Sequence, residues 1–138
     1  MTALYDPFEP ELVEELGGVY VSSQDATLVD VSEERGPFDL IFDSTGFSPI
    51  IWEAAEVLGK NGVLVLASIT GGDRKAEINS DKINQSFVLG NKVMVGTVNA
   101  APADFRSGVD DLIKAEAIYP GWLKQLLTTP IAALALRD

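Results

Sequence analysis

The feature that most constrains the fold is a series of three short apolar runs that alternate with helical patterns. The runs cover residues 38–44, 63–67 and 92–98. The first two are continuously apolar in their middle, which is typical of parallel strands that are covered on both faces. Strands separated by helices at this spacing need crossover connections. The sequence therefore predicts an α/β fold with a mainly parallel sheet flanked by helices.

Helical patterns fill the intervals between these runs. Ser48 and Pro49 suit a helix start, and Gly59 begins a glycine-bounded stop. Further helices are expected over 7–16, 81–89, from Pro102 onward and over 120–127, with one or two helical turns over 28–34 and an extended run over 19–21. The helix from Pro102 is expected to turn an inner face to the core, made of Phe105, Val109, Leu112 and Ile113.

Composition narrows the chemistry that the chain can perform. With 138 residues, we expect one domain spanning the whole chain. It contains no cysteine and no histidine, which removes thiolate nucleophiles, the imidazole base and nearly every zinc site with nitrogen or sulfur ligands.

The net charge of −11 argues against nucleic acid and anionic membranes as partners, and the lack of a long apolar run argues against a membrane span. We expect a cytoplasmic protein.

Candidate ligand residues follow each strand, because doubly wound sheets bind ligands beyond the carboxyl ends of their strands. Each position has a structural alternative: the first two sets form plain turns, and Asn99 caps the helix near Pro102. Asp39 and Asp43 do not form a catalytic pair, since four residues of extended chain separate them by about 13 Å. The candidate residues are Thr45 after the first strand, Ile69, Thr70 and Gly71 after the second, and Thr97, Val98 and Asn99 after the third.

Several motifs taken together resemble one family, the C-terminal region of glucose 1-dehydrogenase in the zinc-dependent medium-chain dehydrogenase superfamily. The more specific ones lie at 89–92, Leu-Gly-Asn-Lys, and at Val98-Asn99. The resemblance extends from about Phe8 to Ile131 and also includes the motifs at 38–41, 45–46, 58–64, 70–72, 83–84 and 119–123.

This resemblance implies a Rossmann-like domain that binds NADP or NAD. In the family, the full enzyme oxidises an aldose at carbon 1, and zinc is held by a separate N-terminal domain. By position, residues 69–71 and 97–99 would contact the nicotinamide half of the cofactor, Thr45 would be a weaker neighbour, and Asn99 would also reach the sugar. We assign no catalytic residue and no metal ligand to this chain.

The sequence departs from the family by lacking the opening strand, the Gly-x-Gly-x-x-Gly turn and the zinc domain. We therefore expect a partial domain without the first strands, with weak or vestigial cofactor binding and no catalysis by itself. The alternative is a non-catalytic module that associates with copies of itself. Losing the first two strands would expose the apolar strand at residues 40–42 as an open edge. We expect an intermolecular sheet, hence a homo-oligomer, or the 19–21 strand moved in to cover this edge.

Overall fold

The computed structural model describes residues 2–3 and 10–126. Within these residues the chain forms two compact units. One contains Thr2–Ala3 and residues 19–99, and the other contains residues 10–18 and 100–126. All the candidate ligand residues belong to the first unit. Whether the whole chain acts as one domain stays a prediction.

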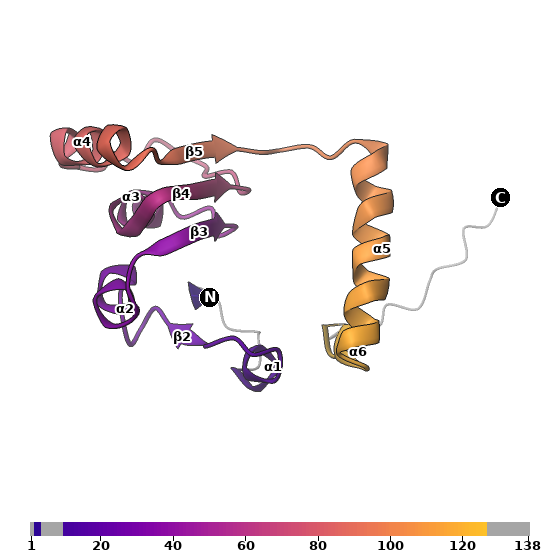
Figure 1. Ribbon diagram of the computed structural model, residues 1–138. Helices are drawn as coiled ribbons and strands as arrows, with labels where there is room; N and C mark the ends of the chain where they lie inside the picture. The colour runs from indigo at the N-terminus through magenta and orange to yellow at the C-terminus, as the bar shows by residue number, and fades with distance from the viewer. Residues whose placement is uncertain (1, 4–9, 127–138) are drawn as a thin grey trace. The chain divides into compact units, whose positions relative to one another are not determined.

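The first unit is built on a parallel three-stranded sheet. Its strands are β3 (Phe38–Asp43), β4 (Leu58–Leu66) and β5 (Val93–Gly96), in the order β3-β4-β5. The three arrows point the same way in Figure 1. In register, Ile41 pairs with Leu64, and Leu64 pairs with Met94. This confirms the predicted α/β class with its mainly parallel sheet.

The start of β4 differs from the sequence expectation. Gly59 to Gly62 were expected to be a stop after the helix, with the strand beginning at Val63, whereas β4 already begins at Leu58. Leu58 pairs with Phe38, and the register shifts before Leu40 pairs with Val63. Asn61 takes a positive φ of 58° within this stretch. Gly59 lies close to the neighbouring backbone, because a Cβ there would be 3.2 Å from the carbonyl oxygen of Phe38. The glycines therefore allow an irregular pairing that strand propensity alone does not reveal.

Helices α2 (Leu28–Arg35), α3 (Ser48–Val57) and α4 (Ser80–Gly90) complete the first unit, and local chemistry defines their ends. At α2, Thr27 and Asp30 form a capping box, whose hydrogen bonds lower the pKa of the Asp30 carboxyl. Helix α4 begins with Asn79 as its cap and ends at Asn91, which adopts the left-handed conformation. The expected turns over 28–34 are thus one regular helix.

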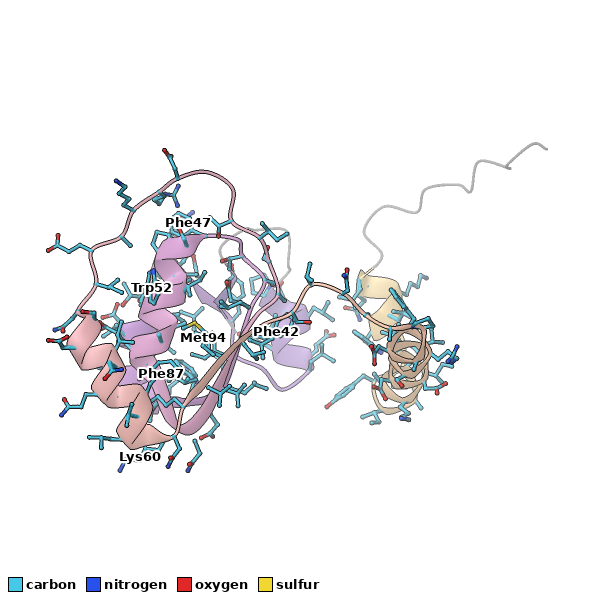
Figure 2. All side chains as sticks on the ribbon, turned by 90° about the horizontal axis from the view of Figure 1, so that it is seen from above. Phe42, Phe47, Trp52, Lys60, Phe87 and Met94 are labelled. Atoms are coloured by element: carbon cyan, nitrogen blue, oxygen red, sulfur yellow. The ribbon has the colours of Figure 1, made fainter. Side chains whose placement is uncertain are left out.

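The core lies on one face of this sheet. Leu64 of β4 is completely buried and forms a cluster with Leu58 and with Ala54 and Ala55 of α3. The small side chains of Ala54 and Ala55 allow the helix to approach the sheet closely. Phe87 of α4 and Met94 of β5 pack against this cluster on the α3 side, as Figure 2 shows. The first unit is therefore held together mainly by one helix packed on the middle strand.

Within the first unit, no described element covers the opposite face of the sheet. Leu40 and Phe42 of β3 are 66% and 64% exposed, and Val93 and Val95 of β5, on the other side of β4, are also exposed. Within the first unit β3 is therefore covered on one face, and the expected cover of its other face stays a prediction. Strand alternation explains the split, because Leu40 and Phe42 point away from the face that carries Ile41 and Leu64.

A second, short parallel pair also belongs to the first unit. Strand β1 (Thr2–Ala3) pairs with β2 (Val21–Ser22), and the pair is separate from the three-stranded sheet. Strand β1 was not expected from the sequence, in which no strand pattern precedes the first helix. The alternative in which the 19–21 strand moves in to cover β3 is wrong for this structure, because β2 pairs with β1 instead. Pairing of β3 with another chain stays a prediction.

The second unit is helical in its described part, with α1 (Pro10–Glu15), α5 (Pro102–Ile118) and α6 (Trp122–Leu126). The expected start of α1 at residues 6–9 lies outside the described residues. Glu116 of α5 accepts hydrogen bonds from the backbone N–H groups of Gly121 and Leu123, and so fixes the turn into α6. No described helix is long and apolar enough to cross a membrane.

Within the second unit, the inner face predicted for α5 is not buried. Its four apolar side chains are all exposed, and α6 is the main described element that packs on this helix. The amphipathic pattern therefore predicted the helix correctly, and the burial of this face stays a prediction because it depends on what packs against it. The exposed positions are Phe105, Val109, Leu112 and Ile113.

Candidate functional site

The carboxyl ends of β3, β4 and β5 meet at one edge of the sheet. The backbone N–H of Ala67 donates to the carbonyl of Asp43 at 2.8 Å, and the N–H of Thr97 donates to the carbonyl of Leu66 at 2.9 Å. These bonds continue the parallel pairing just beyond the strands. The three sets of candidate residues therefore start from adjacent points on one edge, as the sequence predicted.

The turn after β3 is organised by a buried carboxyl group. Asp43 is only 4% exposed, and its Oδ1 accepts hydrogen bonds from the backbone N–H and from the hydroxyl of Thr45, at 2.9 and 2.7 Å. The Thr45 hydroxyl in turn accepts from the N–H of Phe47 at 3.1 Å. Thr45 thus uses its hydroxyl to shape the turn, and any contact with a cofactor would come from the rest of the residue.

Gly46 brings this first turn against the second. Its φ of +63° is a conformation that glycine adopts at little cost. A Cβ at this position would lie 3.0 Å from the Ser68 hydroxyl oxygen and 3.1 Å from the carbonyl oxygen of Ile69. The turn after β3 therefore supports the segment that holds Ile69, Thr70 and Gly71.

The segment after β4 presents an open surface. The side chain of Ile69 is 81% exposed, whereas Thr70 is half-buried. A Cβ built on Gly71 would meet no atom within 4 Å, so its backbone is open to a ligand. An exposed apolar side chain can pack against the face of a planar ring, and accessible peptide groups can hydrogen-bond to its edge.

The segment after β5 is also exposed and accessible to a ligand. Val98 is 77% exposed, and Thr97 and Asn99 are exposed as well. The alternative that Asn99 caps the next helix is wrong, because Ala101 occupies the cap position of α5 and its N–H donates to the Asp104 carboxylate at 2.7 Å. The Asn99 amide is therefore free of a capping role, and it can both donate and accept hydrogen bonds.

A zinc site does not fit the residues of this chain. The described residues contain no cluster of three or more potential metal ligands, and the whole sequence has no cysteine or histidine. Asp39 is exposed whereas Asp43 is buried and bound to Thr45, so these two carboxylates also do not act as a pair. The chemistry of this edge is that of binding through backbone groups, hydroxyls and an amide.

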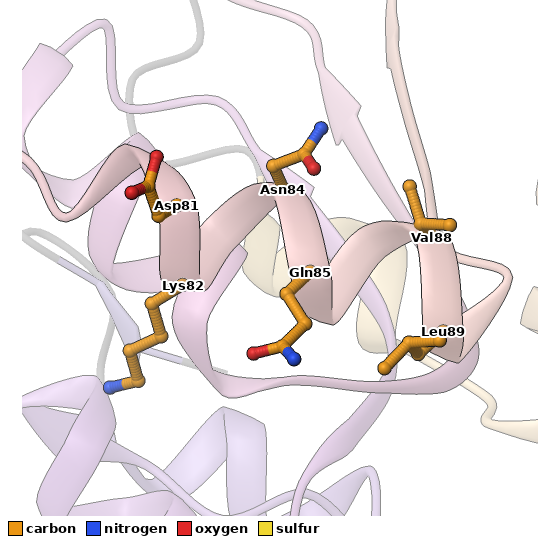
Figure 3. A pocket seen from close by; sticks show the side chains of 6 residues that line it. All are labelled: Asp81, Lys82, Asn84, Gln85, Val88 and Leu89. Carbon is orange, nitrogen blue, oxygen red and sulfur yellow. The ribbon is translucent and has the colours of Figure 1, made fainter.

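The structure also contains a shallow hollow on α4, which Figure 3 shows from close by. All of its lining residues come from this one helix, so no second element closes it. None of the candidate ligand residues contributes to it. The carboxyl edge of the sheet therefore stays the candidate site. The lining residues are Asp81, Lys82, Asn84, Gln85, Val88 and Leu89.

Two features of this edge were missed by sequence reasoning. The role of Asp43 in holding Thr45 could have been found, because an aspartate two residues before a threonine is a common turn pattern. The second feature is a contact between Arg74 and the ring of Phe47, with 4.9 Å between the guanidinium carbon and the ring centroid. It joins residues that are distant in sequence, and no local signal marks it.

A parallel sheet with open, glycine-bearing turns at its carboxyl edge places the protein among Rossmann-type α/β proteins. A family model described as Glucose dehydrogenase C-terminus matches residues 3–136. The chain belongs to this family. This confirms the resemblance inferred from the motifs.

Individual relatives agree with this assignment. A glucose 1-dehydrogenase of Caldivirga maquilingensis is 36% identical over 126 residues, covering 89% of this chain and 33% of the relative. One from Vulcanisaeta moutnovskia is 31% identical over 134 residues, covering 94% and 34%. The solved glucose dehydrogenase of Haloferax mediterranei in complex with NADP, zinc and gluconolactone is 28% identical, with a TM-score of 0.73 over 82% of this chain and 32% of that one. The chain thus spans about a third of the length of the relatives it matches.

The Asp43 turn leads to a stability prediction. Asp43→Ala removes the acceptor for both Thr45 donors and should lower the free energy of unfolding by about 1.5–3 kcal/mol. Asp43→Asn keeps Oδ1 as an acceptor, so it should stay within about 1 kcal/mol of the parent protein. Urea denaturation of the three proteins followed by tryptophan fluorescence tests this. Equal losses in the two variants would show that the carboxyl group is not acting as the acceptor that holds the turn.

Proposed function

We propose that this chain forms the nicotinamide-binding wall of the cofactor cleft of an NAD(P)-dependent glucose, or more broadly aldose, 1-dehydrogenase. The observation that supports it is the meeting of three open turns at one carboxyl edge. Residues 69–71 would contact the nicotinamide half from β4, and residues 97–99 would contact it from β5. Thr45 is a weaker neighbour, since its hydroxyl is used within the turn.

The cofactor, when bound, accepts the hydride that leaves carbon 1 of the sugar. The role of this chain is to bind and orient. Ile69 offers an apolar side chain against a ring face, while Gly71 leaves its peptide groups accessible. The Asn99 amide can bind the carboxamide of the cofactor or a sugar hydroxyl, because it has both donors and an acceptor. Substrate contact is proposed for Asn99 alone.

We propose that binding is weak and that the chain does not oxidise glucose by itself. The sequence contains no Gly-x-Gly-x-x-Gly turn, which normally supplies N–H donors to the pyrophosphate. Its residues also do not fit a zinc site. The relative from Haloferax mediterranei is three times longer than the part that this chain matches, since that part is 32% of it. Catalysis would therefore need residues that this sequence does not contain.

The binding proposal predicts a specific effect of Asn99. Titration calorimetry with NADP and with NAD should show heat at millimolar ligand for the parent protein. Asn99→Ala should weaken binding by about two- to ten-fold, the equivalent of one or two lost hydrogen bonds. Asn84→Ala, on the outer surface of α4, is the matched control and should bind like the parent. Absence of heat with both cofactors in the parent protein would contradict the proposal.

A second candidate function is a non-catalytic module that associates with copies of itself. It is favoured by one observation, the exposed apolar side chains of the edge strand β3. An open strand edge offers unpaired backbone groups to another chain, and an exposed apolar face beside it adds area to bury. A homo-oligomer through this edge would also be compatible with cofactor binding at the carboxyl ends.

Sedimentation velocity tests the self-association. Leu40→Lys places a charge on the exposed face of β3, so the variant should sediment as a monomer at concentrations where the parent is oligomeric. Val88→Lys changes a side chain of almost equal exposure, 67% against 66%, on the outer side of α4, and should leave the oligomer intact. A parent protein that remains monomeric across the micromolar to millimolar range would refute this function.

A further inference from the structure

The segment that follows the candidate residues of β4 has few interactions of its own. Residues 71–77 contain no helix or strand and are all exposed. Among the described residues they make no hydrogen bond and no ion pair, and the ring contact of Arg74 with Phe47 is their one directional interaction. This segment begins with Gly71, one of the residues proposed to contact the cofactor. Its position therefore depends on very few contacts.

The backbone of Phe47, whose ring Arg74 contacts, is held by two hydrogen bonds. Its N–H donates to the Thr45 hydroxyl, and its carbonyl accepts from the N–H of Ile50 at 3.1 Å. Phe47 lies at the start of α3, where Figure 2 labels it. The distance of 4.9 Å between the Arg74 guanidinium carbon and the ring centroid is within the range of cation–π interactions, which extends to about 6 Å.

We propose that Arg74 is a positioning residue for the cofactor-binding segment, acting through its stack on Phe47. Gly46 supports the chain at Ile69, and Phe47 holds it at Arg74, so Thr70, Gly71 and Gly72 lie between two points fixed by the same turn. This arrangement restricts the backbone before a ligand arrives. Binding then costs less conformational entropy than it would from a free segment.

The inference rests on the proposed cofactor binding. In it Arg74 acts through its stack on Phe47 and not through direct attraction to an anionic cofactor, and variants separate these two roles. Arg74→Ala removes both the stack and a charge, whereas Phe47→Leu removes the stack alone. Lys75→Ala removes the same charge from the next position without touching the stack. Phe47→Trp keeps an aromatic platform, and tryptophan is the best partner for a cation.

The experiment combines two measurements on the full 138-residue chain. NMR backbone order parameters should fall at Gly71 and Gly72 in Arg74→Ala and Phe47→Leu, toward the flexible range below about 0.6, and stay high in Phe47→Trp and Lys75→Ala. The dissociation constant for NADP, measured by calorimetry, should rise about two- to five-fold in the first two variants, as expected for an exposed cation–π contact.

Two results would overturn the inference. One is a parent-like order parameter at Gly71 and Gly72 in Phe47→Leu. The other is an equal loss of affinity in Arg74→Ala and Lys75→Ala with no loss in Phe47→Leu, which would assign the effect to charge. If the parent protein binds no NADP, the proposed function fails, and the order parameters of the four variants still decide whether Arg74 fixes the segment.

Discussion

The parallel pairing of β3, β4 and β5 is the constraint on which the rest of the structure depends. Because the three strands run in the same direction and in register, their carboxyl ends coincide, and the turns that follow them are neighbours. The pairing is held from one side, where α3 packs its small alanines on the fully buried Leu64. The Asp43 carboxyl then fixes the turn after β3, and Gly46 packs that turn against the segment after β4. The candidate site is thus a consequence of strand direction together with two local contacts.

Two features of the same sheet support the two candidate functions. Its carboxyl edge has open turns, which support the proposed cofactor binding. Its second face exposes apolar side chains within the first unit, which support the proposed self-association. In the described residues one side of β3 therefore packs in the core and the other, with Leu40 and Phe42, lies open. The chain matches about a third of its relatives' length, and we propose that it provides one wall of a cofactor cleft.

Much of the fold could be predicted from local pattern, and the part that could not depends on long-range contacts. The apolar runs predicted β3 and β5, and Ser48-Pro49 predicted the start of α3. The start of β4 was missed because Gly59 and Gly62 indicate a turn, while the backbone of Phe38 gives them a pairing partner. The burial expected for β3 and for α5 is not reached within either unit by itself, because hydrophobicity shows which side chains favour burial but not what covers them. The sequence correctly predicted that the three sets of candidate residues follow adjacent strands, whereas their role as ligands stays a prediction. The stack of Arg74 on Phe47 depends on tertiary structure alone.

The most direct test of this account is the register of the three strands in solution. Nuclear Overhauser contacts in the isotopically labelled chain should connect Ile41 with Leu64 and Leu64 with Met94, with the pattern of parallel strands. Such contacts would place the ends of all three strands at one edge, as the account requires. Contacts in an antiparallel pattern, or in a register that separates Asp43 from Ala67 and Leu66 from Thr97, would contradict it.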